Sequence, residues 1–265
     1  MAIVLIGQPP EYCSQIMAVI PEVTEPGYIA IPMRRKGWKS VAYLGVLNAG
    51  DGYQPEMEKC LHASERETLN GYWYKPRKRN FLSGRFVAKK VLAKFLKEPD
   101  LTKIIIKPGI FNQPLLSYTT SNPPGFSISH SLSYTSCLVF PQEHPMGIDI
   151  ETSANHAAAQ DITSQLTDRE KTMIKYKGLP EYVFHIKLWT IKEALSKVLK
   201  TGLTAPLEIY EIAEIHRDNY FYFSTFKNFA QYKAITFSWR SNICSFVLPQ
   251  KTKCDLDNLI AYINR

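Results

Sequence analysis

Apolar residues recur every three or four positions between residues 188 and 203, which is the spacing of one face of an α-helix. This face consists of Leu188, Ile191, Leu195, Val198 and Leu199. Gly202 offers an end to the helix. Glu193 and Lys197 stand four residues apart, roughly opposite the apolar face. This pair fits either a surface ion pair worth about 0.3 to 0.5 kcal/mol or a carboxylate and an ammonium held together for chemistry.

Apolar and acidic residues alternate from Gly147 to Glu151, which predicts a short strand. Ile148 and Ile150 lie on one face of this strand, and Asp149 shares the other face with Glu151. Adjacent carboxylates repel each other unless a cation lies between them, and Mg²⁺ commonly takes one or two protein carboxylates together with phosphates and water. A third carboxylate from the predicted helix would complete such a site. The same alternation also fits an exposed edge strand with two solvated acids.

Similar patterns predict further elements on both sides of these two segments. Before them we expect a helix at 81–92 and strands at 41–47, 104–107, 126–131 and 136–140. After them we expect strands at 209–215, 220–226, 232–239 and 243–248, which would form a second antiparallel sheet in a protein of the α+β class. The helix at 81–92 matches the predicted helix that contains Glu193 when shifted by 107 residues, with Phe86 at the place of Glu193. One short match is a weak sign of an internal repeat.

Composition narrows the class of protein. The chain has 265 residues, 45% of them hydrophobic, which is ordinary for a globular protein of one or two domains. We expect no membrane span and no signal peptide. Five scattered cysteines without a C-x-x-C pair argue against a disulfide framework or zinc site and for the cytoplasm. The net charge of +8 favours a polyanionic partner without choosing among nucleic acid, lipid, nucleotide and acidic protein.

Three segments in order resemble the motifs of a known family. They are Ser127-Ile128-Ser129-His130-Ser131, Gly147-Ile148-Asp149-Ile150-Glu151 and Trp189-Thr190-Ile191-Lys192-Glu193-Ala194-Leu195-Ser196-Lys197. The chain is similar in these segments to the 4'-phosphopantetheinyl transferase superfamily, specifically its surfactin-type branch. The resemblance implies a pseudo-twofold arrangement of two similar α/β halves, each an antiparallel sheet packed on a long helix. Residues 1–145 would supply contacts to coenzyme A, and residues 146–265 would hold the metal site and the catalytic helix.

The resemblance also implies a reaction. The enzyme would transfer 4'-phosphopantetheine from coenzyme A to a serine of an acyl- or peptidyl-carrier protein, releasing adenosine 3',5'-bisphosphate. Asp149, Glu151 and Glu193 would hold Mg²⁺, with Mn²⁺ as an alternative ion, against the diphosphate. Lys197 would bind coenzyme A and stabilise the same charge. Glu193 would also act as the base, directly or through metal-bound water, if partial burial raised its pKa.

Coenzyme A contacts are carried over residue by residue. Arg79, and less firmly Lys75, would meet the 3'-phosphate, although a solvated basic surface also fits this cluster. Ser129 and His130 would meet the other phosphates. The family often has Tyr-Gly-Lys-Pro at the adenine loop, where this chain has Phe111, Asn112, Gln113 and Pro114. Asn tolerates the positive φ that Gly supplies, but the missing Lys removes one possible contact.

Other readings remain open from the sequence. A basic surface would suit an acidic carrier protein, and an internal duplication would let a monomer suffice. Nucleic-acid binding is disfavoured because no recognised nucleic-acid motif or base-stacking platform accompanies the basic cluster, and no membrane partner is expected. A Ser-His-Asp hydrolase lacks the G-x-S-x-G elbow. A different metal-dependent phosphotransferase or nuclease, and a non-catalytic binder of coenzyme A or a carrier, are the alternatives.

Overall fold

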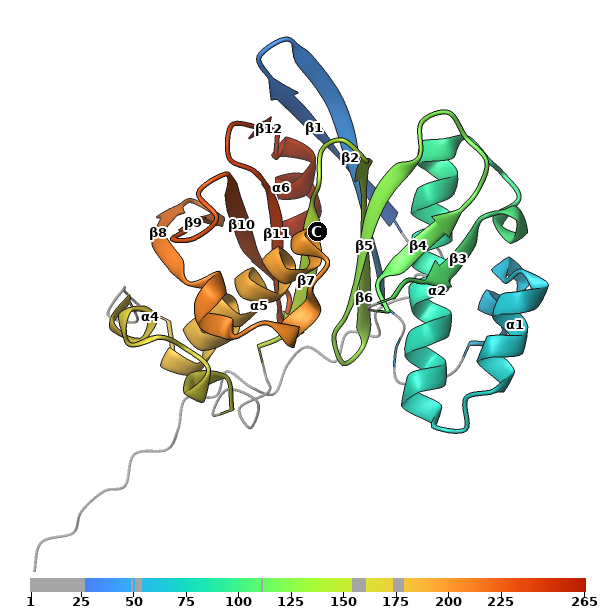
Figure 1. The fold of residues 1–265 in the computed structure, drawn as a ribbon, viewed down its shortest axis with the longest axis horizontal. Coiled ribbons are helices and arrows are strands. Elements are labelled where there is room, and N and C mark those ends of the chain that lie inside the picture. The colour runs from blue at the N-terminus through green and yellow to red at the C-terminus, as the bar shows by residue number, and fades with distance from the viewer. Residues whose placement is uncertain (1–26, 49, 51–53, 111, 154–160, 174–178) are drawn as a thin grey trace, which may run out of the picture.

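The fold contains two five-stranded antiparallel sheets and one two-stranded sheet (Figure 1). The computed structural model describes residues 27–48, 50, 54–110, 112–153, 161–173 and 179–265. The first sheet has the order β12 (Lys253–Cys254), β1 (Gly27–Arg35), β2 (Trp38–Asn48), β6 (Tyr134–Pro141), β5 (Pro124–His130). The second has the order β7 (Gly147–Thr152), β11 (Asn242–Pro249), β10 (Tyr232–Trp239), β9 (Phe221–Phe226), β8 (Ile212–Asp218). The small sheet pairs β3 (Ile105–Pro108) with β4 (Pro114–Ser117).

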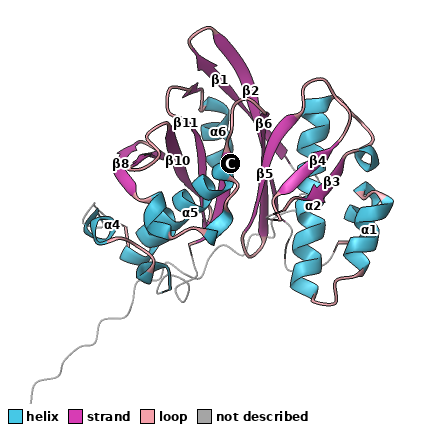
Figure 2. Ribbon diagram, viewed as in Figure 1, coloured by secondary structure: helices cyan, strands magenta, loops and turns pink. Residues whose placement is uncertain are grey.

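Two long helices cover the sheets, α2 on the first sheet and α5 on the second (Figure 2). The helices are α1 (Ala63–Asn70), α2 (Lys75–Leu96), α4 (Asp168–Met173), α5 (Glu181–Leu199) and α6 (Asp257–Ile263). Helix α5 begins seven residues before the predicted start at Leu188, and its end comes at Lys200, whose φ of 58° is left-handed. No described helix has the length and apolar content needed to cross a lipid bilayer. The mixed, antiparallel class is the one predicted.

Three large apolar clusters of the described residues hold the layers together, beside a small one formed by Ile162, Ile186 and Ile243. One face of each large sheet contributes to a shared cluster that includes Leu44 and Leu138 from the first sheet and Ile148 and Phe246 from the second. The opposite faces pack separately under α2 and under α5. The alternation of strand side chains explains this division, because successive residues of β6 and of β7 point to opposite faces.

The C-terminal segment of the chain packs against the first sheet. Cys254 of β12 pairs with Met33 of β1, and α6 also packs against β1. The last residues of the second half therefore complete the first sheet. A period-two pattern can predict a strand, but it does not indicate which sheet the strand joins or at which edge.

Serine side chains join the two sheets along the neighbouring edges of β5 and β7. The hydroxyl of Ser127 accepts a hydrogen bond from the backbone N–H of Ile148 at 3.2 Å, and that of Ser129 accepts one from Ile150 at 3.2 Å. Ser131 donates to Asn242 Oδ1 at 3.0 Å. Residues at every second position of a strand share one side, so the three serines form one row. We call Ser127, Ser129 and Ser131 the serine row.

Each long helix is anchored by a buried ion pair of the same design. Glu65 in α1 pairs with Lys89 in α2 and also accepts a hydrogen bond from Ile106 N in β3. In the second half, Glu170 in α4 lies 2.6 Å from Lys192 in α5. Its other oxygen accepts the N–H of Ile212 in β8.

These ion pairs relate Lys89 to Lys192, an offset of 103 residues, one helical turn away from the 107 that the sequence match predicts. A one-turn slip keeps the apolar face of a helix in place, so hydrophobic spacing alone cannot distinguish the two registers.

Candidate active site

The centre of the candidate site is an ion pair between Lys197 of α5 and Asp149 of β7. Lys197 Nζ lies 2.7 Å from Asp149 Oδ1 and donates a second hydrogen bond to the carbonyl of Ile148 at 3.0 Å. Ser129 donates to the same Asp149 oxygen at 2.7 Å. Asp149 is buried, and its Oδ2 has no hydrogen-bond partner in the described part of the chain. One carboxylate oxygen is therefore held firmly while the other is unsatisfied.

The approach of α5 to β7 that makes this pair possible depends on Gly147. A Cβ at this position would collide with the carbonyl oxygen of Ala194 and lie 3.0 Å from the backbone nitrogen of Val198. Glycine thus lets the helix backbone come close enough for a side chain four residues beyond Glu193 to reach the strand. The G-I-D-I-E motif needs its glycine for packing as well as its acids for charge.

Glu151 and Glu193 lie near the same centre and are both partly buried. The pKa of Glu193 is raised from 4.5 to about 7, first by burial and then by the Asp149 carboxylate. Burial followed by the charges of Asp149 and Glu193 raises the pKa of Glu151 to about 7 as well. Lys197 opposes both shifts without cancelling them. The predicted acids therefore share one electrostatic environment, with a single ammonium among three carboxyl groups.

Lys197 does not form the local ion pair that its spacing from Glu193 suggests. Among the described residues, Lys197 forms its ion pair with Asp149 instead. The reason is tertiary: at 2.7 Å the buried carboxylate of Asp149 is a better partner than a carboxylate one helical turn away.

The carboxylates fit a divalent cation by chemistry, although they do not converge on one point. Their oxygens are the ligands that Mg²⁺ prefers, and Asp149 Oδ2 is a buried acceptor without a partner. Within the described part of the chain, however, no three His, Cys, Asp or Glu side chains are grouped as a metal site requires. The charge of the site favours a cation, and the side chains would have to turn toward it.

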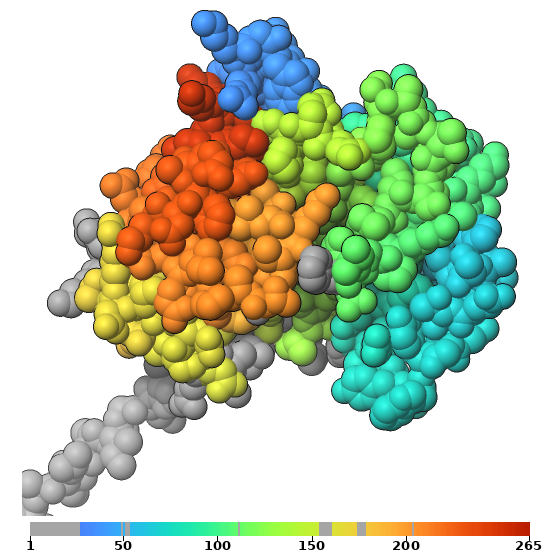
Figure 3. Space-filling view, viewed as in Figure 1, coloured from blue at the N-terminus to red at the C-terminus, as the bar shows by residue number. Residues whose placement is uncertain are grey.

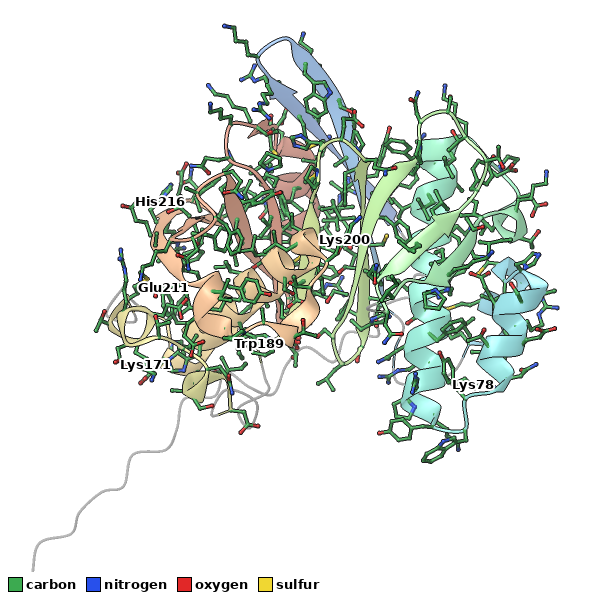
Figure 4. All side chains as sticks on the ribbon, in the orientation of Figure 1. Lys78, Lys171, Trp189, Lys200, Glu211 and His216 are labelled. Carbon is green, nitrogen blue, oxygen red and sulfur yellow. The ribbon has the colours of Figure 1, made fainter. Side chains whose placement is uncertain are left out.

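Two cavities flank this centre. One, of about 530 Å³, is lined by Lys197 together with Asn112, Gln113 and Pro114 of the β3–β4 loop. Its lining combines residues from 197–202 with residues from 112–128, and Lys200, another lining residue, marks the place in Figure 4. Figure 3 shows the segments around residues 200 and 115 facing each other on this side of the molecule. The other, of about 710 Å³, is lined by Glu151, Trp189 and the residues 204–207. The acids and the lysine thus stand between two separate spaces.

The β3–β4 loop agrees with one detail of the sequence argument. Asn112 has a φ of 59°, the left-handed conformation for which Asn was expected to replace Gly. Gln113 and Pro114 line the same cavity as Lys197. Phe111, also predicted to contact coenzyme A, lies outside the described residues.

His130 and Ser129 are held by the protein itself. His130 Nε2 donates to the carbonyl of Asn80 at 2.8 Å, and the ring packs against Gly84. Burial first, with nearby Lys197 and Arg79 adding to it, lowers the pKa of His130 to about 4. The hydroxyl hydrogen of Ser129 is directed to Asp149, so both residues that were expected to meet phosphates already donate to groups of the protein in this arrangement.

The basic residues at the start of α2 divide into two groups. Arg79 is half-buried, makes weak 3.4 Å contacts to Asn80, and lies close enough to His130 to lower its pKa. Lys75 is exposed at the first turn of the helix, toward the end marked by Lys78 in Figure 4. Arg79 is therefore near the candidate site, whereas no contact connects Lys75 to it.

Lys192 and Glu170 form a buried pair next to the candidate site that the local sequence pattern did not predict. Glu170 does cap α4, since its carboxylate accepts the N–H of Thr167, but it also holds the buried ammonium of Lys192. Lys192 also donates to the carbonyl of Leu207, beside the second cavity. The sequence did contain a sign of this pair, because a lysine on the buried side of a helix needs a buried acid as its partner.

One protein-family model matches part of the chain. Residues 145–247, less than half of the chain, match the family model described as the 4'-phosphopantetheinyl transferase superfamily. No curated protein matches the chain.

Two solved structures show a low similarity. A holo-(acyl-carrier-protein) synthase from Bacillus anthracis, in complex with CoA (3',5'-ADP), is 22% identical over 43% of this chain and 96% of its own, with a TM-score of 0.33. The holo-[acyl-carrier-protein] synthase of Thermotoga maritima is 18% identical over 46% and 69%, with a TM-score of 0.30. Scores this low carry no conclusion by themselves, and the family match is the finding that bears on function.

The matched segment contains Asp149, Glu151, Glu193 and Lys197, the residues that the structure gathers between the two cavities. Residues 145–247 thus carry a domain of the 4'-phosphopantetheinyl transferase superfamily, and this domain supports an enzyme of that class, a 4'-phosphopantetheinyl transferase.

Proposed function

We propose that the protein transfers 4'-phosphopantetheine from coenzyme A to a serine of an acyl- or peptidyl-carrier protein. The observation that carries this proposal is the Asp149–Lys197 pair with two raised-pKa glutamates, placed between two cavities within the superfamily domain. A transfer between two substrates needs a charged centre that both can reach. The serine oxygen would attack the β-phosphorus of coenzyme A, the bond to the adenosine bisphosphate oxygen would break, and adenosine 3',5'-bisphosphate would leave.

The residues of the chain have separate parts in this reaction. Lys197, held by Asp149, would stabilise negative charge that develops on the diphosphate. Glu193 would take the serine proton, and a pKa of about 7 suits a base near neutral pH. Asp149, Glu151 and Glu193 would hold Mg²⁺, with Mn²⁺ as the alternative. Such an ion supplies Lewis-acid neutralisation of phosphoryl charge when bound.

We assign coenzyme A to the 530 Å³ cavity. Asn112, Gln113 and Pro114 line it together with Lys197, which supports adenine at the loop and the diphosphate at the lysine. Arg79 of α2 and His130 of β5 would contact the phosphates of coenzyme A. Lys75, at the first turn of α2, is a weaker candidate for the same role. Ser129 would act by fixing Asp149, or would bind phosphate if it released that carboxylate.

Several finer assignments belong to the same proposal. The pseudo-twofold arrangement, and the division at 145 and 146, are supported by the matching ion pairs Glu65–Lys89 and Glu170–Lys192. Both halves lie in one chain, which is why we expect a monomer. An acidic carrier would suit the positive net charge. Free thiols at the four described cysteines agree with a cytoplasmic location, and the motif pattern favours the surfactin-type branch.

A direct assay tests the proposal. The full chain is incubated with coenzyme A, Mg²⁺ and a panel of apo carrier proteins, and each carrier is weighed by mass spectrometry. We expect the mass gain of one phosphopantetheine group on at least one carrier, lost when Mg²⁺ is chelated. No gain on any carrier, with coenzyme A still bound, would instead favour a non-catalytic binder. Turnover of a nucleotide without a carrier would favour another metal-dependent phosphotransferase.

Variants locate the activity. Asp149→Ala and Lys197→Ala should each reduce the rate by about 100-fold or more, since each removes a charge placed at the reacting phosphate. Lys171→Ala, which removes an exposed ammonium of a loose surface ion pair, is the matched control and should keep the rate. Normal turnover by Asp149→Ala would contradict the assignment of the centre.

A further inference from the structure

The tip of the β1–β2 hairpin carries a dense group of cations outside the candidate active site. The hairpin projects from the body of the molecule (Figures 1 and 3). A groove of about 720 Å³ at its tip has six cationic side chains in its lining and no carboxylate. We call this the hairpin groove, lined by Arg34, Arg35, Lys36, Gly37, Trp38, Lys39, Lys251 and Lys253.

Three of these cations stand abreast across three strands. Arg34 of β1 is paired directly with Lys39 of β2 and with Lys253 of β12. Directly paired residues of an antiparallel ladder point to the same face, with strands about 4.8 Å apart. Like charges in such positions destabilise a sheet. The row therefore has an unfavourable electrostatic energy unless an anion compensates it.

The described residues do not provide that compensation through an ion pair. Among the ion pairs of the described residues none involves any of the six cations. Two acids lie at the border of the groove: Asp255 lines a neighbouring depression that shares Arg34 and Lys39, and Glu143 is next to His144. Two acids at the border leave most of the positive charge of the groove unbalanced.

The backbone under the groove is well ordered for binding. The hairpin pairs over nine positions, from Gly27–Val46 to Arg35–Trp38, and Gly37 takes the positive φ of 73° that its tight turn needs. The Trp38 ring stacks on the buried His144 ring at 4.6 Å between centroids. Cations fixed on such a frame lose less freedom when they bind than cations on a loop.

The side chains of the hairpin groove limit the kinds of ligand that it can bind. The most exposed large hydrophobic side chains of the described structure all lie outside the groove, so it has no large apolar anchor for a bilayer. Trp38, the aromatic residue in its lining, is partly exposed but stacks on His144, so the groove does not offer a series of free rings for successive bases. Arg34 and Arg35 offer the planar, bidentate geometry that suits phosphate. A phosphate group brings more charge per ligand atom than a carboxylate, which matches six cations in one small space.

We infer that the hairpin groove binds a multiply charged phosphate ligand, at a site separate from the transfer reaction. A soluble oligophosphate and a phosphorylated lipid headgroup present the same groups, so phosphate is the recognised chemistry and the source is decided by experiment. The groove shares no lining residue with either cavity at the candidate active site.

The test compares two variants of the full chain with the same change in net charge. The groove variant carries Arg34→Gln, Lys39→Gln and Lys253→Gln, which removes the cationic row. The control variant carries Lys59→Gln, Lys103→Gln and Lys171→Gln, three cations of loose surface ion pairs. Binding of inorganic tripolyphosphate is measured by calorimetry at two salt concentrations, and carrier loading is measured in parallel.

We expect the groove variant to bind tripolyphosphate about tenfold more weakly than the wild type, with a smaller salt dependence, and the control variant to differ by less than about twofold. Binding of the wild type, but not of the groove variant, to vesicles with a phosphomonoester headgroup would also support the site. It would identify a lipid as the source of the phosphate. Carrier loading should be equal in all three proteins. Equal tripolyphosphate binding in both variants, or tighter competition by polyglutamate than by tripolyphosphate, would overturn the inference.

Discussion

At the scale of single residues, the candidate site depends on which partner each charged group finds. Lys197 pairs with Asp149 of the strand, although Glu193 is its neighbour on the helix. Burial first, and then the charge of Asp149, raises the pKa values of Glu193 and Glu151 to about 7, which suits a base near neutral pH. The motifs named these residues, because acids at alternate strand positions and a carboxylate four residues before a lysine are local patterns. The motifs did not predict which charged groups pair with each other, because pairing depends on distances between separate elements.

Ser129 is expected to position Asp149. Its hydroxyl accepts the N–H of Ile150 and donates to Asp149 Oδ1, so it fixes the carboxylate that holds Lys197. Ser129→Ala should lower kcat for carrier loading by roughly 10- to 100-fold, as loss of a supporting hydrogen bond at a catalytic group commonly does, with little change in KM for coenzyme A. Ser129→Thr, which keeps the hydroxyl, should recover most of kcat. A rise in KM alone would show that Ser129 contacts coenzyme A instead.

His130 should make stability depend on pH in the acid range. Its folded-state pKa is lowered from 6.5 to about 4, so the folded protein holds it neutral while the unfolded chain protonates it. The stability this provides is complete above pH 6.5 and is lost as the pH falls toward 4. His130→Gln retains a donor for the Asn80 carbonyl and cannot titrate. Thermal unfolding between these pH values should therefore show a smaller decrease for His130→Gln than for the wild type, and equal slopes would contradict the prediction.

At the scale of elements, the site is made by the contact between α5 and β7. The periodic pattern of α5 predicted its apolar face correctly, since Leu188, Ile191 and Leu195 are fully buried. The strand pattern likewise predicted β7 and its two faces. The sequence did not indicate the row of serines that joins β5 to β7. A serine that bonds across an edge and a serine exposed to solvent have the same local pattern.

Gly147→Ala should separate these two elements. The added methyl group would overlap the Ala194 carbonyl of the helix backbone, which cannot turn aside as a side chain can. We expect a loss of about 1 to 3 kcal/mol in the free energy of unfolding, the usual range for overpacking, with a larger proportional loss of carrier loading. Urea denaturation measures the first. Gly27→Ala is the control, because nothing lies within 4 Å of its added Cβ.

At the scale of the whole molecule, two helix-on-sheet units share one core between their sheets. Each unit holds its long helix to a neighbouring strand through a buried Glu–Lys pair, and each lets a helix approach a strand at a glycine, Gly45 under α2 and Gly147 under α5. Only the second unit carries the acids of the candidate site.

The two buried pairs should differ in their effect on stability. Lys192→Met leaves the buried Glu170 without its cation, so it should cost about 3 to 5 kcal/mol in the free energy of unfolding. Lys89→Met leaves Glu65 with Arg85, whose Nε lies 3.3 Å from Glu65 Oε1, so it should cost less than Lys192→Met. Lys59→Met, at an exposed ion pair, should cost less than about 1 kcal/mol. Urea denaturation of the three variants provides the comparison, and an effect of Lys192→Met as small as that of Lys59→Met would contradict the prediction.

The sequence by itself determined the class of fold, the positions of most strands and helices, and the acids and lysine of the candidate site. It could do so because hydrophobic periodicity and residue spacing are local, and each is set by the geometry of one element. The tertiary structure alone decided that Lys197 pairs with Asp149, that Ser129 donates a hydrogen bond to this carboxylate, and that β12 joins the first sheet. These features depend on how closely elements approach, and a distance between separate elements has no periodic trace in the chain.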